Sequence, residues 1–115
     1  MNTALFLRNT GRRYQKHPVF QEVLVSKLAT KADCDSLGVS LLEIAPGAEI
    51  SPHIHEVSLD SIYVLSGEGE AYINGEWRGI GTGDYILVPE KVEHGIRNND
   101  HAPLTLFVVQ SPPLF

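Results

Sequence analysis

Short apolar runs recur along the chain at close spacing, and Gly, Pro and Asn separate them. Runs of four to eight residues rich in β-branched and aromatic side chains are typical of β-strands. No stretch of ten or more residues shows a helical period. We therefore expect about nine strands in an all-β sandwich or barrel. They cover residues 20–28, 39–44, 51–55, 60–66, 70–73, 76–78, 85–88, 93–97 and 104–110, and residues 4–7 either form one more or pack on a neighbour.

Two glycine-containing stretches mark turns between these strands. Asn74-Gly75 lies between β-rich flanks and predicts a hairpin, since a type I′ turn needs positive φ at both central residues. Residues 79–83 read Gly-Ile-Gly-Thr-Gly and are followed by a strand-like run. A phosphate-binding loop would need a helix there, so we expect tight turns at the end of a barrel.

Length and composition limit the class of protein. A chain of 115 residues predicts one domain, 1–115, with an N-terminal segment at 1–19 and a proline-stiffened tail at 111–115. Apolar residues make up 43% and charged residues 20%, which is ordinary for a globular chain. The net charge of −5 argues against a nucleic-acid partner. Cys34 is the single cysteine, and no run has the length of a membrane span. We expect a cytoplasmic protein with no membrane partner.

The candidate chemistry centres on histidine. His53 and His55 alternate on a predicted strand, so both imidazoles face the same side. Asp60 follows within reach, and an antiparallel barrel can bring His94 beside them from a distant strand. Imidazoles and a carboxylate suit a transition metal. Glu56 is an alternative carboxylate, but its side chain is expected on the face opposite to His55.

Two motifs resemble those of the cupin superfamily, and together they span roughly half of the chain. They read Gly47-x5-His53-x-His55-x4-Asp60-x6-Gly67 and Gly83-x5-Pro89-x-Lys91-x2-His94-x3-Asn98. The resemblance implies an antiparallel jelly-roll barrel, also called a double-stranded β-helix. It also implies metal ligation by His53, His55, Asp60 and His94. The ligand types suit Fe, Mn, Ni, Zn or Cu and do not choose among them.

Two positions depart from the family pattern. Asp60 stands where these proteins usually have Glu, so its shorter side chain could reach a metal directly, bind through water, or accept a bond from an imidazole N–H. Lys91 stands where the second motif usually has Gly, so a turn with positive φ would be strained there.

The resemblance to cupins does not identify a single reaction. We expect a metal-dependent enzyme of dioxygenase or sugar isomerase/epimerase type acting on a small polar metabolite. The alternative is a non-catalytic module that binds a carbohydrate or other small ligand, with or without metal. A storage role is a poorer match. His17 and His101 are expected to be exposed and not to ligate the metal, and Tyr72 or Trp77 could line the mouth of a pocket.

Exposed edges of a barrel favour association. We therefore expect a homodimer in which residues 1–19 exchange between partners. Leu5 to Leu7 and Pro112 to Phe115 are the candidate contacts.

Overall fold

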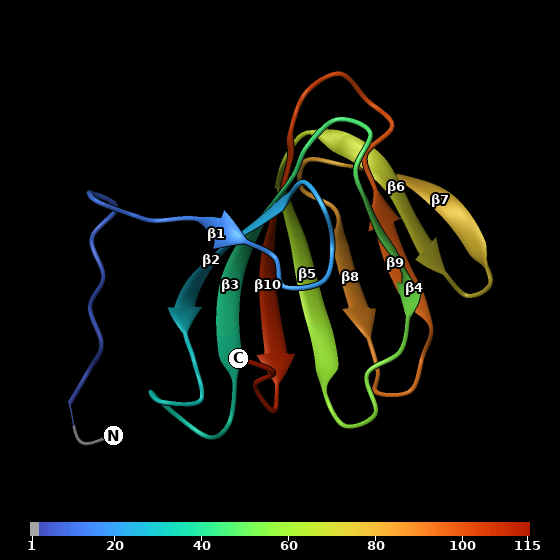
Figure 1. The fold of residues 1–115 in the computed structure, drawn as a ribbon. Coiled ribbons are helices and arrows are strands. Elements are labelled where there is room, and N and C mark those ends of the chain that lie inside the picture. Colours follow the sequence, from blue (N-terminus) through green and yellow to red (C-terminus); the bar gives the residue numbers. More distant parts are fainter. Residues whose placement is uncertain (1–2) are drawn as a thin grey trace.

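Two antiparallel sheets face each other and enclose a core (Figure 1). The computed structural model describes residues 3–115. One sheet has six strands in the order β1-β2-β3-β10-β5-β8, and the other has four in the order β4-β9-β6-β7. The strands are β1 Gln15–Lys16, β2 Val23–Ala29, β3 Gly38–Ile44, β4 Glu49–His53, β5 Leu59–Ser66, β6 Glu68–Ile73, β7 Glu76–Gly81, β8 Tyr85–Val88, β9 His94–Arg97 and β10 Leu104–Ser111.

This arrangement confirms the predicted all-β jelly-roll class. Strands distant in sequence lie side by side, since β10 pairs with both β3 and β5, and β9 pairs with both β4 and β6. Residues 3–115 contain no helix of the length and hydrophobicity that crossing a membrane would require.

The hairpin predicted at Asn74-Gly75 joins β6 to β7. Asn74 has a φ of 52° and Gly75 a φ of 83°, as the type I′ turn demands. The glycine-rich stretch after it continues β7 as far as Gly81 and then turns at Gly83, which has a φ of 93°. These glycines therefore serve strand and turn geometry.

The core lies between the sheets and is built by the alternating residues that point inward. Leu104 and Leu106 of β10, Ile44 of β3 and Val64 of β5 are almost completely buried, and Ala71 of β6 faces them from the second sheet. These strands thus each have one face toward the core.

The N-terminal residues differ from the expectation. Residues 4–7 form no strand; they are exposed in an arm that extends away from the barrel (Figure 1), and the first strand is β1. β2 begins at Val23 rather than at residue 20, because residues 18–22 form bends and a turn in which Glu22 has a φ of 57°. The predicted homodimer stays a prediction.

The C-terminal tail packs on its own barrel. The backbone N–H of Lys31 donates to the carbonyl of Phe115 at 2.7 Å, and the ammonium of Lys27 lies 4.7 Å from the centre of the Phe115 ring. The hydroxyl of Ser58 donates to the carbonyl of Pro112 at 2.6 Å. These contacts hold the Phe115 ring at the edge of an internal cavity.

Candidate metal centre

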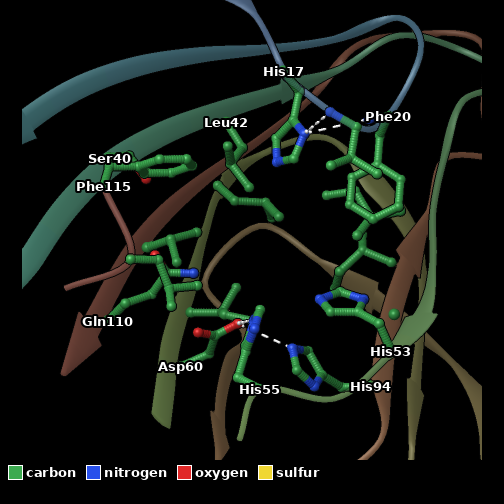
Figure 2. A pocket seen from close by; sticks show the side chains of 18 of the residues that line it. His17, Phe20, Ser40, Leu42, His53, His55, Asp60, His94, Gln110 and Phe115 are labelled. Carbon is green, nitrogen blue, oxygen red and sulfur yellow. Dashed lines mark hydrogen bonds and ion pairs between the residues drawn. The ribbon is translucent and has the colours of Figure 1, made fainter. Parts of the chain in front are cut away.

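Four side chains from both sheets meet at one end of this cavity (Figure 2). His53 ends β4 and lies opposite His94, which begins β9 in the same sheet. His55 follows β4 by two residues, and Asp60 belongs to β5 in the six-stranded sheet. The structure therefore brings together all four residues that the sequence predicted for the site.

The three imidazoles form a tight group. Their ring centres are 4.8 Å apart for His53 and His55, 4.5 Å for His53 and His94, and 5.1 Å for His55 and His94. One ring nitrogen from each lies within 4.8 Å of the others. Three converging imidazole nitrogens are compatible with binding a metal ion.

Backbone carbonyls fix the orientation of two of these rings. The Nδ1–H of His53 donates to the carbonyl of Ser51 at 2.7 Å, and the Nδ1–H of His94 donates to the carbonyl of Val92 at 2.9 Å. A neutral imidazole carries one N–H, so Nε2 of each ring keeps its lone pair. Such backbone partners are typical of metal-binding histidines.

The connection between β8 and β9 anchors the third histidine. The backbone N–H of Lys91 donates to the carbonyl of His55 at 2.7 Å. Lys91 has a φ of 64°, so the turn does need the left-handed conformation that glycine usually supplies. The departure at Lys91 therefore leaves the turn geometry intact, with a strained backbone.

The buried carboxylate of Asp60 faces two of the imidazoles. Its Oδ2 lies 3.0 Å from Nε2 of His94 and 3.4 Å from Nε2 of His55. Within residues 3–115 its other oxygen, Oδ1, is buried and meets no hydrogen-bond donor. A buried carboxylate oxygen without a partner is costly, so the site fits an additional cation.

These contacts shift the pKa values of the site. Burial alone would raise the pKa of Asp60, but the bonds with His55 and His94 outweigh burial and hold it well below its usual range. Burial alone would lower the pKa of His94, but Asp60 and the Val92 carbonyl raise it. Burial lowers the pKa of His53. Since Nδ1 of His94 already donates to Val92, its contact with Asp60 needs a second proton or a metal ion in between.

The cavity that contains this group has a volume of about 360 Å³, near the lower end of the range for small-molecule sites. Its walls are mainly aliphatic and aromatic, and they include Phe20, Leu42, Ile50, Leu106, Val108 and Phe115. Besides the four residues above, its polar groups come from His17, Ser40 and Gln110. A ligand here would contact apolar walls over most of its surface.

The remaining predicted residues lie outside the site. Glu56 and His101 are exposed, as expected. Neither Tyr72 nor Trp77 lines this cavity, within the part of the chain described; their rings are 5.4 Å apart, and the guanidinium of Arg97 lies 4.0 Å from the centre of the Trp77 ring.

The prediction that His17 is exposed is wrong, although His17 lies outside the group of three imidazoles that could hold a metal. His17 is half-buried and lines the cavity. Its ring packs 4.9 Å from that of Phe20. No periodic pattern pointed to it, because the segment that carries it becomes part of the site only by crossing the open end of the barrel.

Comparisons with known proteins agree with this fold. A family model described as "Cupin domain" matches residues 40–110. Protein SchB of Streptomyces halstedii is 31% identical over 75 residues, which are 65% of this chain and 53% of that protein. The chain spans about half the length of the curated relatives it matches.

Solved structures share the architecture across nearly the whole chain. A predicted oxalate decarboxylase from Thermotoga maritima has a TM-score of 0.84 at 21% identity, covering 94% of this chain and 99% of that one. KdgF from Halomonas sp. has a TM-score of 0.81 at 25% identity, covering 96% and 94%. These likenesses show the same fold. The family match covers both histidine motifs and more than half of the chain, and it shows that the chain belongs to the cupin domain family.

Proposed function

We propose that this cupin holds a divalent transition metal with His53, His55, His94 and Asp60, and that it acts as an enzyme on a small molecule bound in the cavity. Protein nitrogen and oxygen ligands lie about 2.0–2.2 Å from such an ion, which separates neighbouring ligand atoms by roughly 3.0–3.5 Å. The observation that carries the proposal is the spacing at Asp60, whose Oδ2 lies 3.0 Å and 3.4 Å from two imidazole nitrogens.

The choice of Asp at this position is consistent with direct ligation. Asp60 is shorter than the Glu that the family usually carries, but its strand places Oδ2 beside both imidazoles. Burial favours a role at the metal over a role in solvent, because the side chain of Asp60 is only 7% exposed. We therefore assign Asp60 as the fourth ligand.

The chain's own groups would do three things in the reaction. A bound metal would supply Lewis-acid polarisation of a substrate oxygen. The carbonyls of Ser51 and Val92 hold two imidazoles in the orientation that ligation needs. The apolar walls exclude water from the reacting group, and the side chain of Gln110 offers a polar contact beside Asp60, its register partner.

The nature of the cavity bears on the choice of substrate. The small polar metabolite expected from the sequence stays a prediction. The hydroxyl groups of such a molecule would face mainly apolar walls, which is unfavourable. These walls support a substrate with an apolar body and oxygen atoms at the metal end. Dioxygenase and isomerase chemistry both remain proposals.

Metal content tests the proposal directly. We expect the purified protein, or protein reconstituted with Fe, Mn, Ni, Zn or Cu, to hold about one ion per chain. His53→Ala and His94→Ala should weaken binding at least about 100-fold, since each removes a direct ligand. Plasma mass spectrometry after gel filtration measures the loss.

Glu56→Gln is the matched control, because it removes an exposed carboxylate beside His55 and should leave metal content unchanged. A wild-type protein that takes up none of these metals would overturn the proposal. Metal binding with ligand-induced stabilisation but no turnover would favour the binding module instead.

A further inference from the structure

The outer end of the cavity carries a histidine that the metal centre does not use. His17 follows β1 and lies across the cavity from Asp60 and His94 (Figure 2). Phe20 and Phe115 flank it, with ring centres 4.9 Å and 6.3 Å from the imidazole. The ring of Phe20 also lies 5.7 Å from that of His53, so aromatic surface runs from the outer end to the metal centre.

Two backbone donors determine the tautomer of His17. The N–H groups of Val19 and Phe20 donate to its Nδ1, at 3.1 Å and 3.3 Å. Because Nδ1 accepts, the proton of the imidazole lies on Nε2. Figure 2 shows this second nitrogen pointing into the cavity. His17 therefore presents a fixed N–H donor to whatever the cavity holds.

Within residues 3–115, both hydrogen bonds of the His17 ring are made at Nδ1. The N–H at Nε2 therefore has no acceptor among these residues. Between it and the metal centre the walls are mainly apolar, with Leu42 and Leu106 on the six-stranded sheet and Ile50 on the other, and Ser40 and Gln110 add the remaining polar side chains. A ligand that spans the cavity thus meets His17 at one end, the metal centre at the other and mainly apolar surface along its body.

We propose that Nε2–H of His17 is a ligand-binding donor, and that the cavity takes a flat, largely apolar molecule with metal-ligating oxygens at one end and a hydrogen-bond acceptor at the other. The metal-facing half rests on the function proposed above, whereas the His17 half rests on its own geometry. The rings of Phe20 and Phe115 favour a planar body, because aromatic faces stack on flat molecules.

Two flat probes of nearly equal size test the donor. Esculetin carries a vicinal diol at one end and a lactone carbonyl at the other, and naphthalene-2,3-diol has the same diol and no carbonyl. We expect Zn²⁺-loaded protein to bind esculetin about three- to tenfold more tightly, as one neutral hydrogen bond provides. Galacturonate, a polar and non-planar sugar acid, should bind more weakly than either. Calorimetric titration measures all three affinities.

Two substitutions separate ligand binding from a structural role. His17→Asn places its carbonyl oxygen near the position of Nδ1, so it can still accept from Val19 and Phe20, but it removes the donor at Nε2. We expect the preference for esculetin to fall to about one. His17→Gln keeps an amide donor near the position of Nε2 and should retain the preference. Zn²⁺ content should stay close to wild type in both, and thermal unfolding should stay close to wild type in His17→Asn, which keeps the acceptor for Val19 and Phe20.

Distinct outcomes overturn distinct claims. Equal affinity for the two diols, an unchanged preference in His17→Asn, or tighter binding of galacturonate would each overturn this inference, even with Zn²⁺ bound. Failure to bind any of Fe, Mn, Ni, Zn and Cu would instead overturn the proposed metal centre. In that case coumarin and naphthalene, which lack the diol, test the His17 half in metal-free protein, and equal affinity for these two would overturn it.

Discussion

The two ends of the cavity are built in different ways. At the inner end, His53, Asp60 and His94 lie on strands whose hydrogen-bonded register fixes their positions, and His55 lies two residues beyond β4. At the outer end, His17 and Phe20 come from bends between β1 and β2, and Phe115 comes from the tail. The inner end is polar and holds a buried carboxylate, whereas the outer end is mainly aromatic.

This difference separates the residues proposed to hold the metal from those proposed to contact the ligand. A barrel can hold metal ligands in fixed positions because each one is tied to the backbone ladder of a sheet. Segments outside the ladder can change length and composition without disturbing the register of the strands. We infer that the inner end sets the reaction class and that the outer end selects the ligand.

Asp60→Asn gives the largest expected effect in the comparison. The amide has the same shape as the carboxylate but no charge, and Asp60 is proposed as a direct ligand, so metal affinity should fall at least about 100-fold. The ligand preference that depends on His17 should persist wherever metal is still bound. Competition with a chelator measures the affinity. Unchanged metal affinity in Asp60→Asn would show that the carboxylate takes no part in the site.

The sequence predicted the inner end better than the outer end for a physical reason. The alternation expected along residues 51–55 indicated that His53 and His55 share a face, and two motifs at fixed spacing add Asp60 and His94. The structure ends β4 at His53, but His55 still points to the same group. His17 carries no such signal, because nothing local indicates which bend will cross a cavity formed by strands far along the chain. The same limit explains why β2 was predicted to begin at Phe20, whose apolar ring faces the cavity from a bend.

The next prediction concerns the pH dependence of metal-free protein. The raised pKa of His94 stabilises the fold below its unfolded value of about 6.5, and this contribution is lost as pH rises through the folded pKa. The depressed pKa of Asp60 stabilises the fold above about pH 3.9, and this contribution is lost as pH falls through the folded pKa. Their joint contribution should therefore be greatest between about pH 4 and 6.5.

Urea unfolding of metal-free protein across this range measures the effect. The lowered pKa of His53 acts in the opposite direction to that of His94, so the difference between wild type and Asp60→Asn is measured; it reports the interactions of the carboxylate with the surrounding imidazoles. When Asp60→Asn is added to His17→Asn, the change in stability should equal the change that Asp60→Asn causes in wild type, because His17 lies at the outer end. Metal ligation needs neutral imidazoles, so loaded protein should instead gain stability as pH rises. A pH-independent difference between wild type and Asp60→Asn would contradict the ion pair.

Removing the N-terminal arm should have the smallest effect on metal binding at the inner end. Leu5, Phe6 and Leu7 are 45%, 75% and 49% exposed in an arm that contacts little of its own barrel. If this arm packs on a second copy, a chain that begins at residue 13 should be monomeric, with unchanged metal content. Light scattering measures the mass, and Phe6→Ser is the milder variant. A wild-type monomer at micromolar concentration would contradict the predicted homodimer.

The position of Asp60 has one further consequence. Asp60 belongs to the six-stranded sheet, whereas His53 and His94 belong to the four-stranded sheet, so any ion they share fastens one layer to the other. Local opening of β4 and β9 would have to break this link first. Amide hydrogens of these two strands should therefore exchange with solvent more slowly in loaded protein, while those of the distant β6–β7 hairpin keep their rates.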